Sequence, residues 1–230
     1  MPYLLAIETA TKVCSVGLFK DDQLLLLKEE KGAYSHAENL AEFTSKLLTE
    51  SNLSAKDLSG IIVSKGPGSY TGLRIGVSFA KGLCYALKIP LISIDTLHAL
   101  ALGWVQAENP QVDLICPMID ARRMEVYSAI YTSDLKCFKS ISADILEVDS
   151  YREILQNKTV VFIGDGAAKC QNLLIEKARS FRSDFLPSAA YLGKEGYKKL
   201  LTSEIEDIAY FEPYYLKEFI TLRSTKGNLS

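Results

Sequence analysis

A glycine-rich run between a buried strand and a helix is the strongest constraint on the fold of this chain. Residues 66–76 read GPGSYTGLRIG. Gly66 and Gly68 fit a sharp backbone path, because only glycine takes positive φ freely. Gly72 and Gly76 fall inside the predicted helix, where each costs roughly 1 kcal/mol relative to alanine. We therefore expect something to approach the backbone of this helix closely.

Composition limits the classes of protein to which the chain can belong. It has 230 residues, of which 48% are hydrophobic, and this suits one large or two small globular domains with a buried core. The net charge is −2, and neither half is basic enough to bind nucleic acid well by itself. No apolar stretch reaches the ~18 residues of a membrane-spanning helix. We therefore expect no association with membranes.

The cysteines indicate a reducing compartment. They stand at positions 14, 84, 116, 137 and 170, and no two of them form a CxxC pair. An odd number without paired spacing is typical of reduced, mostly buried thiols in a cytosolic protein. A strand-like run follows Met1 and Pro2 at once, so no signal peptide is predicted. The expected location is cytoplasmic.

Strands precede helices twice along the chain. The first series has apolar strand patterns at 3–7, 13–19 and 24–27, then helical patterns at 35–50 and 71–87. The second series has strands at 114–119, 125–131 and 160–163, then helices at 168–179 and 191–201. The polar residues 108–111 are the best break between them. This order predicts an α/β protein with an N-terminal lobe over 1–107, a C-terminal lobe over 108–216 and a flexible tail over 217–230.

An acidic residue follows the first strand of each series. Glu8 and Thr9 come after the first strand of the chain, and Asp120 ends the strand that opens the second half. Two such residues are what a nucleotide clamp between two lobes needs. Arg122 and Arg123 follow Asp120, and this arrangement fits either anion binding or a structural ion pair where strand meets turn.

Other catalytic motifs are absent or incomplete. No stretch fits the GxxxxGK[ST] loop that holds phosphates, although a phosphate at the helix N-terminus and a purely structural loop both fit the glycine-rich run. His36 and His98 are far apart in sequence, and no histidine pair at metal-ligand spacing occurs, so no metal site is predicted. Ser78 comes nearest to a GxSxG nucleophile but falls in the middle of a helix.

Several stretches resemble the TsaB (YeaZ) family. In the first half they are LAIETAT at 5–11, CSV at 14–16, SHAE at 35–38, the glycine-rich run, and AKGL at 80–83. In the second half they are IDARR at 119–123, EVY at 125–127 and PYYL at 213–216. The match covers nearly the whole chain. The resemblance implies a two-lobed α/β fold of the actin, Hsp70 and sugar-kinase type with ribonuclease H-like lobes. It also implies a role in making N6-threonylcarbamoyladenosine at position 37 of transfer RNA.

The resemblance further implies partners. In this family TsaB is the non-catalytic partner of TsaD, which holds the metal and transfers the threonylcarbamoyl group, and TsaE, an ATPase, joins the complex. The chain is then expected to be no enzyme, to need no cofactor or metal, to meet transfer RNA only through the complex, and to form homodimers when alone. Its helices at 35–50 and 71–87 would enter a four-helix bundle. The residues expected at this interface are Leu40, Thr44, Leu47, Gly72, Leu73, Gly76, Val77, Ala80 and Cys84.

The nucleotide cleft of the wider fold differs here from that of active enzymes. Glu8 and Thr9 stand in the first phosphate loop, where nucleotide enzymes keep an aspartate and glycines, and Asp120 is followed by alanine instead of glycine. Gly164 and Gly166 resemble the fold's adenosine loop. The expectation is weak ATP or ADP binding without independent catalysis. The alternatives are an active ATP-dependent phosphotransferase or ATPase of the same fold, and a metalloprotease-type glycoprotease.

Overall fold

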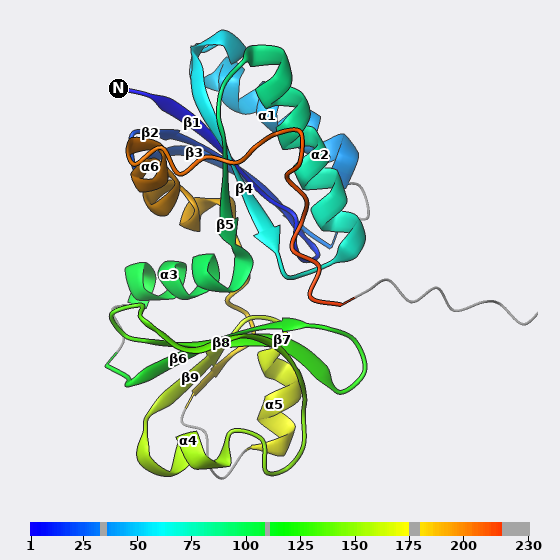
Figure 1. Ribbon diagram of the computed structural model, residues 1–230, viewed down its shortest axis with the longest axis vertical. Coiled ribbons are helices and arrows are strands. Elements are labelled where there is room, and N and C mark those ends of the chain that lie inside the picture. Colours follow the sequence, from blue (N-terminus) through cyan, green and yellow to red (C-terminus); the bar gives the residue numbers. More distant parts are fainter. Residues whose placement is uncertain (33–35, 109–110, 175–179, 218–230) are drawn as a thin grey trace, which may run out of the picture.

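The computed structural model describes residues 1–32, 36–108, 111–174 and 180–217, which form two lobes joined at a narrow waist (Figure 1). Each lobe contains a five-stranded mixed sheet. The strand order is β3-β2-β1-β4-β5 in the first sheet and β10-β9-β6-β7-β8 in the second. The expected α/β fold with two lobes of related design is confirmed, because the two sheets have the same topology and β6 corresponds to β1.

The strands of the first sheet are β1 (Tyr3–Glu8), β2 (Val13–Lys20), β3 (Gln23–Lys31), β4 (Leu58–Gly66) and β5 (Leu91–Asp95). Those of the second are β6 (Leu114–Asp120), β7 (Glu125–Thr132), β8 (Cys137–Ile145), β9 (Val160–Ile163) and β10 (Ser180–Arg182). The central strand of each sheet pairs antiparallel with the following strand and parallel with a later one. Almost every residue of β1 and β6 is buried, because helices cover both faces of these central strands.

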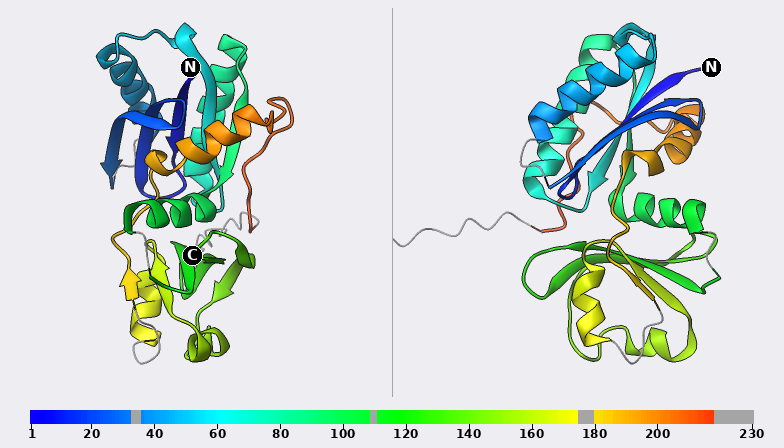
Figure 2. Two further views of the ribbon diagram at one scale, coloured as in Figure 1. Left: turned by 90° about the vertical axis from the view of Figure 1, so that its left-hand side faces the viewer. Right: turned by 180° about the vertical axis from the view of Figure 1, so that it is seen from behind.

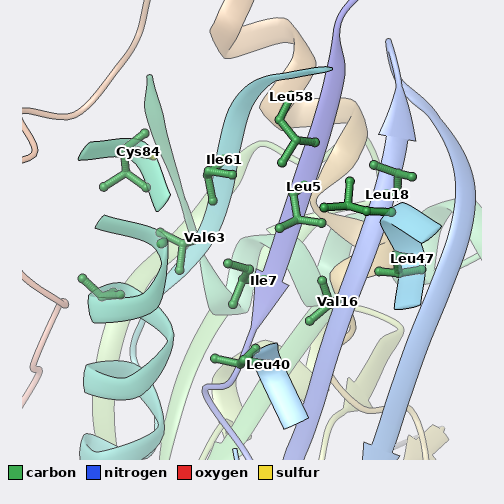
Figure 3. Close-up of a cluster of buried hydrophobic side chains, with 14 of the residues drawn as sticks. Leu5, Ile7, Val16, Leu18, Leu40, Leu47, Leu58, Ile61, Val63 and Cys84 are labelled. Carbon is green, nitrogen blue, oxygen red and sulfur yellow. The ribbon is translucent and has the colours of Figure 1, made fainter. Parts of the chain in front are cut away.

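Two helices cover one face of the first sheet. They are α1 (His36–Glu50) and α2 (Tyr70–Leu87), and the short 3₁₀ helix η1 (Ala55–Asp57) leads from α1 to β4. Leu40 and Leu47 of α1 reach the strand residues Leu5 and Val16 in one cluster of buried side chains (Figure 3). Full burial of each such leucine contributes about 1.5–3 kcal/mol. Residue 35, with which the sequence analysis began the first helix, lies outside the described residues.

The helix α3 (Thr96–Glu108) lies between the two sheets (Figure 1). Leu97 and Leu100 belong to a cluster that includes strands of the second sheet, whereas Ala99 packs against the first sheet. A helix that is apolar on all sides is buried on more than one side. The helix α3 therefore provides hydrophobic core to both lobes and fixes their separation. On the outer face of the second sheet lie α4 (Arg152–Asn157) and α5 (Ala167–Leu173).

The predicted division of the chain into lobes is wrong at its C-terminal end. The 3₁₀ helix η2 (Ala189–Tyr191) and α6 (Gly193–Leu201) return to the first lobe, where Ala189 and Leu192 pack on its sheet. The Ala189 N–H donates to Ser15 Oγ of β2 at 2.9 Å. The first lobe thus needs two separate stretches of chain, since the second face of its sheet is covered by α3 together with residues that follow the second lobe.

After α6, a C-terminal strap (residues 207–217) runs beside α2 towards the waist (Figures 1 and 2). Phe211 is buried in the first-lobe core, and the Tyr214 N–H donates to the Lys65 carbonyl at 2.7 Å. Lys217 then pairs with Glu125 of the second lobe. The strap therefore links the two lobes. The tail predicted over 217–230 lies outside the described residues beyond Lys217.

Candidate functional site

The loop between β1 and β2 folds onto the start of α2. Thr9 Oγ1 donates to the Gly72 carbonyl at 2.8 Å, and the Ser69 N–H donates to the Ala10 carbonyl at 2.7 Å. A Cβ atom at Gly72 would overlap the Thr9 carbonyl oxygen, and one at Gly76 would overlap Thr9 Oγ1. The close approach expected from these glycines is therefore internal to the chain.

This packing corrects the predicted interface. All nine residues that the sequence analysis assigned to a partner are buried within the first lobe: Leu40, Thr44, Leu47, Gly72, Leu73, Gly76, Val77, Ala80 and Cys84. A side chain enclosed by its own core cannot contact a second molecule. The ridge of small residues from Gly72 to Cys84 lies against the β1–β2 loop and the sheet, because small side chains allow backbone to approach the helix there as well as they would in a bundle.

Glu8 ends β1 beneath that loop and is completely buried, with an exposed fraction of 0%. Its Oε1 accepts a hydrogen bond of 2.6 Å from the Ala10 N–H, while Oε2 has no partner among the described residues. Burial raises the pKa of this carboxyl to about 7, although the hydrogen bond from the Ala10 N–H acts in the opposite direction. Thr9 is buried beside it. A ligand would reach either residue only if the loop moved away from α2.

Asp120 occupies the equivalent place in the second lobe and has a different environment. Its side chain is 45% exposed, and Oδ1 accepts hydrogen bonds from Lys169 Nζ at 2.8 Å and from the Arg122 N–H at 2.6 Å. The Asp120 N–H donates to Asp165 Oδ1 at 3.0 Å. Burial raises the pKa of Asp165, and the positive charge of Lys12, from the first lobe, opposes that shift. Asp120 therefore stands at the waist, open to solvent and partly neutralised.

The two glycines of the second lobe are packing positions. Gly164 has φ +98°, and a Cβ there would overlap the Met118 carbonyl oxygen of β6. The Gly166 N–H donates to the same carbonyl at 3.2 Å. The structure therefore brings Gly164 and Gly166 close to Asp120 through Asp165, whereas Glu8 and Thr9 are buried within the first lobe. The predicted cleft residues are thus only partly assembled.

The two histidines occupy separate environments. His36 is buried at the start of α1, and its Nε2 donates to the Thr11 carbonyl at 3.0 Å. The His98 ring packs edge-on against Tyr131 with a centroid distance of 5.4 Å, and burial lowers the pKa of its imidazole. No group of three or more histidine, cysteine, aspartate or glutamate side chains within the described ranges is arranged to hold a metal ion.

The outer sides of α1 and α2 carry small side chains that sequence reasoning missed. In α1 these are Ala37, Ala41 and Ser45; in α2 they are Ser78, Gly82 and Ala86. All six are exposed, and they follow i, i+4 spacing on each helix. A Cβ at Gly82 would meet no atom within 4 Å. The available signal was Gly82 itself, since helical spacing places it outside the i, i+4 row of Gly72 and Gly76.

An apolar groove of about 980 Å³ opens at the C-terminal end of the same helix. Tyr85 and Ile89 line one side of it, and Leu200, Ile205 and Ile208 line the other. Tyr85 is 81% exposed. Together with the small side chains on the outer side of α2, the groove gives this end of the first lobe an exposed apolar surface. Exposed apolar surface of this kind is typical of sites that bind another molecule.

Comparison with known proteins agrees with this architecture. The family model for TsaD, described as tRNA N6-adenosine threonylcarbamoyltransferase, matches residues 30–211. The TsaB proteins of Bacillus subtilis and Escherichia coli, whose full name is tRNA threonylcarbamoyladenosine biosynthesis protein TsaB, are similar in sequence. The first is 29% identical, covering 93% of each chain, and the second is 36% identical, covering 57% of this chain and 55% of the other.

Solved structures show the same fold. YeaZ from Pseudomonas aeruginosa superposes with a TM-score of 0.81 at 24% identity, over 94% of this chain and all of the other. An activator of 2-hydroxyisocaproyl-CoA dehydratase from Clostridium difficile superposes with a TM-score of 0.51 at 10% identity, covering 89% and 98%. In the part of the chain that the structure describes, no helix is long and apolar enough to cross a membrane. The chain therefore belongs to the TsaD family, and within it to the TsaB (YeaZ) proteins.

Proposed function

We propose that this chain is a non-catalytic subunit in the synthesis of threonylcarbamoyladenosine in transfer RNA, and that it acts by pairing with a TsaD-like transferase. Relatives that match most of its length are named as biosynthesis proteins for this modified nucleoside. The observation that carries the pairing proposal is Gly82, a glycine in the middle of α2 with open space around it.

Gly82 has no explanation within the chain. A glycine in a helix interior costs roughly 1 kcal/mol relative to alanine. Gly72 and Gly76 are required by Thr9, whereas alanine would fit at Gly82 without any contact. A helix of a partner that packs on Ser78, Gly82 and Ala86 would need that space. The exposed row on α1 would extend the contact towards the ~1,600 Å² of a typical stable interface.

The same face suits more than one state of assembly. When no TsaD-like partner is present, the outer sides of α1 and α2 of two copies would pair with each other. In the complex, a TsaE-like ATPase would join the two paired proteins. The apolar groove beside Tyr85 is continuous with the end of α2, and it offers additional contact area to either partner.

A non-catalytic role is supported by the first lobe. In an active nucleotide enzyme of this fold, the loop after β1 stays open to receive phosphate. Here that loop is bonded to Gly72, and Glu8 beneath it is buried with a pKa of about 7. A nucleotide would therefore bind weakly, through the second lobe near Asp120. The chain would require no cofactor of its own.

Reconstitution tests the function. This chain is mixed with the TsaD-like and TsaE-like proteins of its organism, transfer RNA, ATP and threonylcarbamoyl-adenylate, and modified adenosine is measured with and without the chain. We expect product only when both the chain and the TsaD-like protein are present. Product from the chain alone would show that it is itself an enzyme. Unchanged product when the chain is omitted would exclude a role in this reaction.

A substitution in α2 tests the pairing face. We expect Gly82→Trp to weaken pairing at least tenfold in sedimentation, because the indole fills the space that a partner helix would occupy. The monomer should fold normally, since nothing lies within 4 Å of that position. Ala107→Trp, at an exposed alanine of α3, is the matched control and should pair normally. Normal pairing by Gly82→Trp would remove this face from the proposal.

A further inference from the structure

The turn between β6 and β7 contains two arginines in an unfavourable backbone conformation. Arg122 and Arg123 have φ angles of 69° and 47°, in the left-handed region that long side chains rarely adopt. The turn is held in place by the Arg122 N–H, which donates to Asp120 Oδ1 at 2.6 Å, and by the Ala121 N–H, which donates to the Glu125 carbonyl at 3.1 Å. Glycine or asparagine would meet the same backbone requirement with less strain.

The charges of these two arginines are not neutralised locally. Neither guanidinium forms a hydrogen bond or an ion pair with any residue that the structure describes, and both side chains are exposed. The carboxylates beside them are already occupied by other cations. Asp120 pairs with Lys169 at 2.8 Å, and Glu125 pairs with Lys217 of the C-terminal strap. The turn therefore presents two free guanidinium groups.

The surroundings add positive charge and an aromatic ring. Tyr127 lies within the electrostatic reach of both Arg122 and Lys217, and it is only half-buried. Lys12 lies across the waist in the first lobe, near Asp165. Lysines and arginines thus surround the turn, and its two neighbouring carboxylates, Asp120 and Glu125, are each paired with a lysine. This is a local patch on a chain whose net charge is −2.

We propose that Arg122 and Arg123 form a phosphate-binding pair that binds the backbone of transfer RNA in the assembled complex. The planar guanidinium group binds phosphate oxygens in a bidentate manner. The inference rests on the proposed function, which provides the RNA. It assigns to this chain a direct contact with the substrate, in the second lobe and therefore apart from the protein-pairing face on α1 and α2.

The test replaces the arginines by residues that suit the turn. Arg122→Asn with Arg123→Gly removes both guanidiniums and relieves the positive-φ strain, so the variant should melt at or above the temperature of the wild type. In the reconstituted system, product formation is measured over a range of transfer RNA concentrations. We expect the KM for transfer RNA to rise about tenfold with kcat unchanged. The slope of the logarithm of RNA affinity against the logarithm of salt concentration should become shallower by an amount that corresponds to about two phosphate contacts.

Three further measurements identify the source of any effect. Arg152→Asn removes an exposed arginine of α4 that pairs with Asp149, and it should leave the KM unchanged. Replacing both turn arginines with lysine keeps the charge but loses the bidentate geometry, so an intermediate KM is expected. Sedimentation with the TsaD-like protein reports pairing, which the double variant should retain.

The failure of this inference and the failure of the proposed function give different results. If the chain is required for product and the double variant has the wild-type KM, the RNA contact is wrong and the proposed function stands. If the double variant loses pairing instead of RNA affinity, the turn is a protein contact and the inference is also overturned. If omission of the chain leaves product unchanged, the proposed function itself fails.

Discussion

Glu8 and Asp120 occupy the same position in two sheets of the same topology, and their environments are opposite. Each ends the central strand of its sheet at the waist. Glu8 is fully buried with one oxygen unpartnered, whereas Asp120 is 45% exposed and bonded to Lys169. The difference comes from the helix that packs beside each strand end. In the first lobe the glycines of α2 let the β1–β2 loop close over the carboxyl.

The comparison shows that a shared topology does not fix the environment of equivalent residues. A two-lobed nucleotide enzyme needs both strand ends open to the same space. Here the hydrogen bond from Thr9 Oγ1 to the Gly72 carbonyl holds the β1–β2 loop against α2 on the first-lobe side. The second lobe keeps an exposed aspartate and a turn with free arginines. One lobe is therefore specialised for internal packing, and the other keeps groups that can bind anions.

The largest expected effect on stability comes from forcing the β1–β2 loop away from α2. Gly72→Leu places a side chain where the Thr9 carbonyl lies, and backbone there cannot move without disrupting β1. We expect a loss of about 4 kcal/mol in the free energy of unfolding, because overpacking against backbone is among the costliest substitutions. Urea denaturation measures it. For the same reason Gly76→Leu should destabilise the first lobe instead of selectively blocking pairing.

Gly82→Ala is the matched control for that substitution. It lies in the same helix with no atom near its Cβ position, so the gain in helix propensity should stabilise the monomer by roughly 1 kcal/mol. Equal losses of stability for Gly72→Leu and Gly82→Ala would contradict the assignment of the two faces of α2.

The second prediction concerns pH and the buried carboxyl. The folded-state pKa of Glu8 is raised from 4.5 to about 7, so folding favours its protonated form. Below pH 4.5 the carboxyl is protonated in both states and does not destabilise the fold. As the pH rises from 4.5 to 7, the free energy of unfolding falls by up to about 3 kcal/mol, because each pKa unit corresponds to 1.36 kcal/mol. Glu8→Gln should remove this slope. It is measured by urea denaturation from pH 4.5 to 8.

Other titratable groups around Glu8 contribute to the pH dependence of stability. Glu29 of β3 raises the pKa of Glu8, and Cys14 of β2 lies within its electrostatic reach. Glu29→Gln is therefore a useful companion variant, and it should reduce the slope only slightly. A Glu8→Gln variant with the same pH dependence as the wild type would show that the carboxyl is not desolvated.

The smallest effect on stability is expected from substitution of Asp120, the exposed one of the two carboxylates. Asp120→Asn weakens a partly exposed ion pair with Lys169, and such pairs contribute less than about 1 kcal/mol. The protein should also pair normally with a TsaD-like partner, since Asp120 is on neither α1 nor α2. If urea denaturation showed that Asp120→Asn lowers the free energy of unfolding by several kcal/mol, Asp120 would be as important for stability as a buried carboxylate. The contrast drawn between Glu8 and Asp120 would then be wrong.

Much of the fold follows from patterns along the chain. The apolar runs of β1 and β6 predict central strands, and the helical spacing of Leu40, Thr44 and Leu47 predicts that one side of α1 is buried. The motifs from the glycine-rich run to the final PYYL identify the family. These signals are local, because strand and helix periodicity are expressed within a few residues of sequence.

The faces of α2 could not be assigned in this way. Periodicity separates Gly72, Gly76, Ala80 and Cys84 from Ser78, Gly82 and Ala86, but it does not say which row faces the chain's own loop. Both rows are small, and a close approach from inside or outside leaves the same pattern. The predicted interface therefore falls on the buried row.

Local patterns predict the central strands, the long helices, the two-lobed α/β class and the family, but they do not predict β8, α4 or β10. The three-dimensional packing shows that α6 belongs to the first lobe, that Glu8 is buried beneath the β1–β2 loop, and that the guanidiniums of Arg122 and Arg123 are exposed. The physical reason is the distance along the chain. Burial depends on contacts between residues far apart in sequence, such as Thr9 with Gly72, 63 positions apart, and Ser15 with Ala189, 174 positions apart, and no local pattern records those contacts.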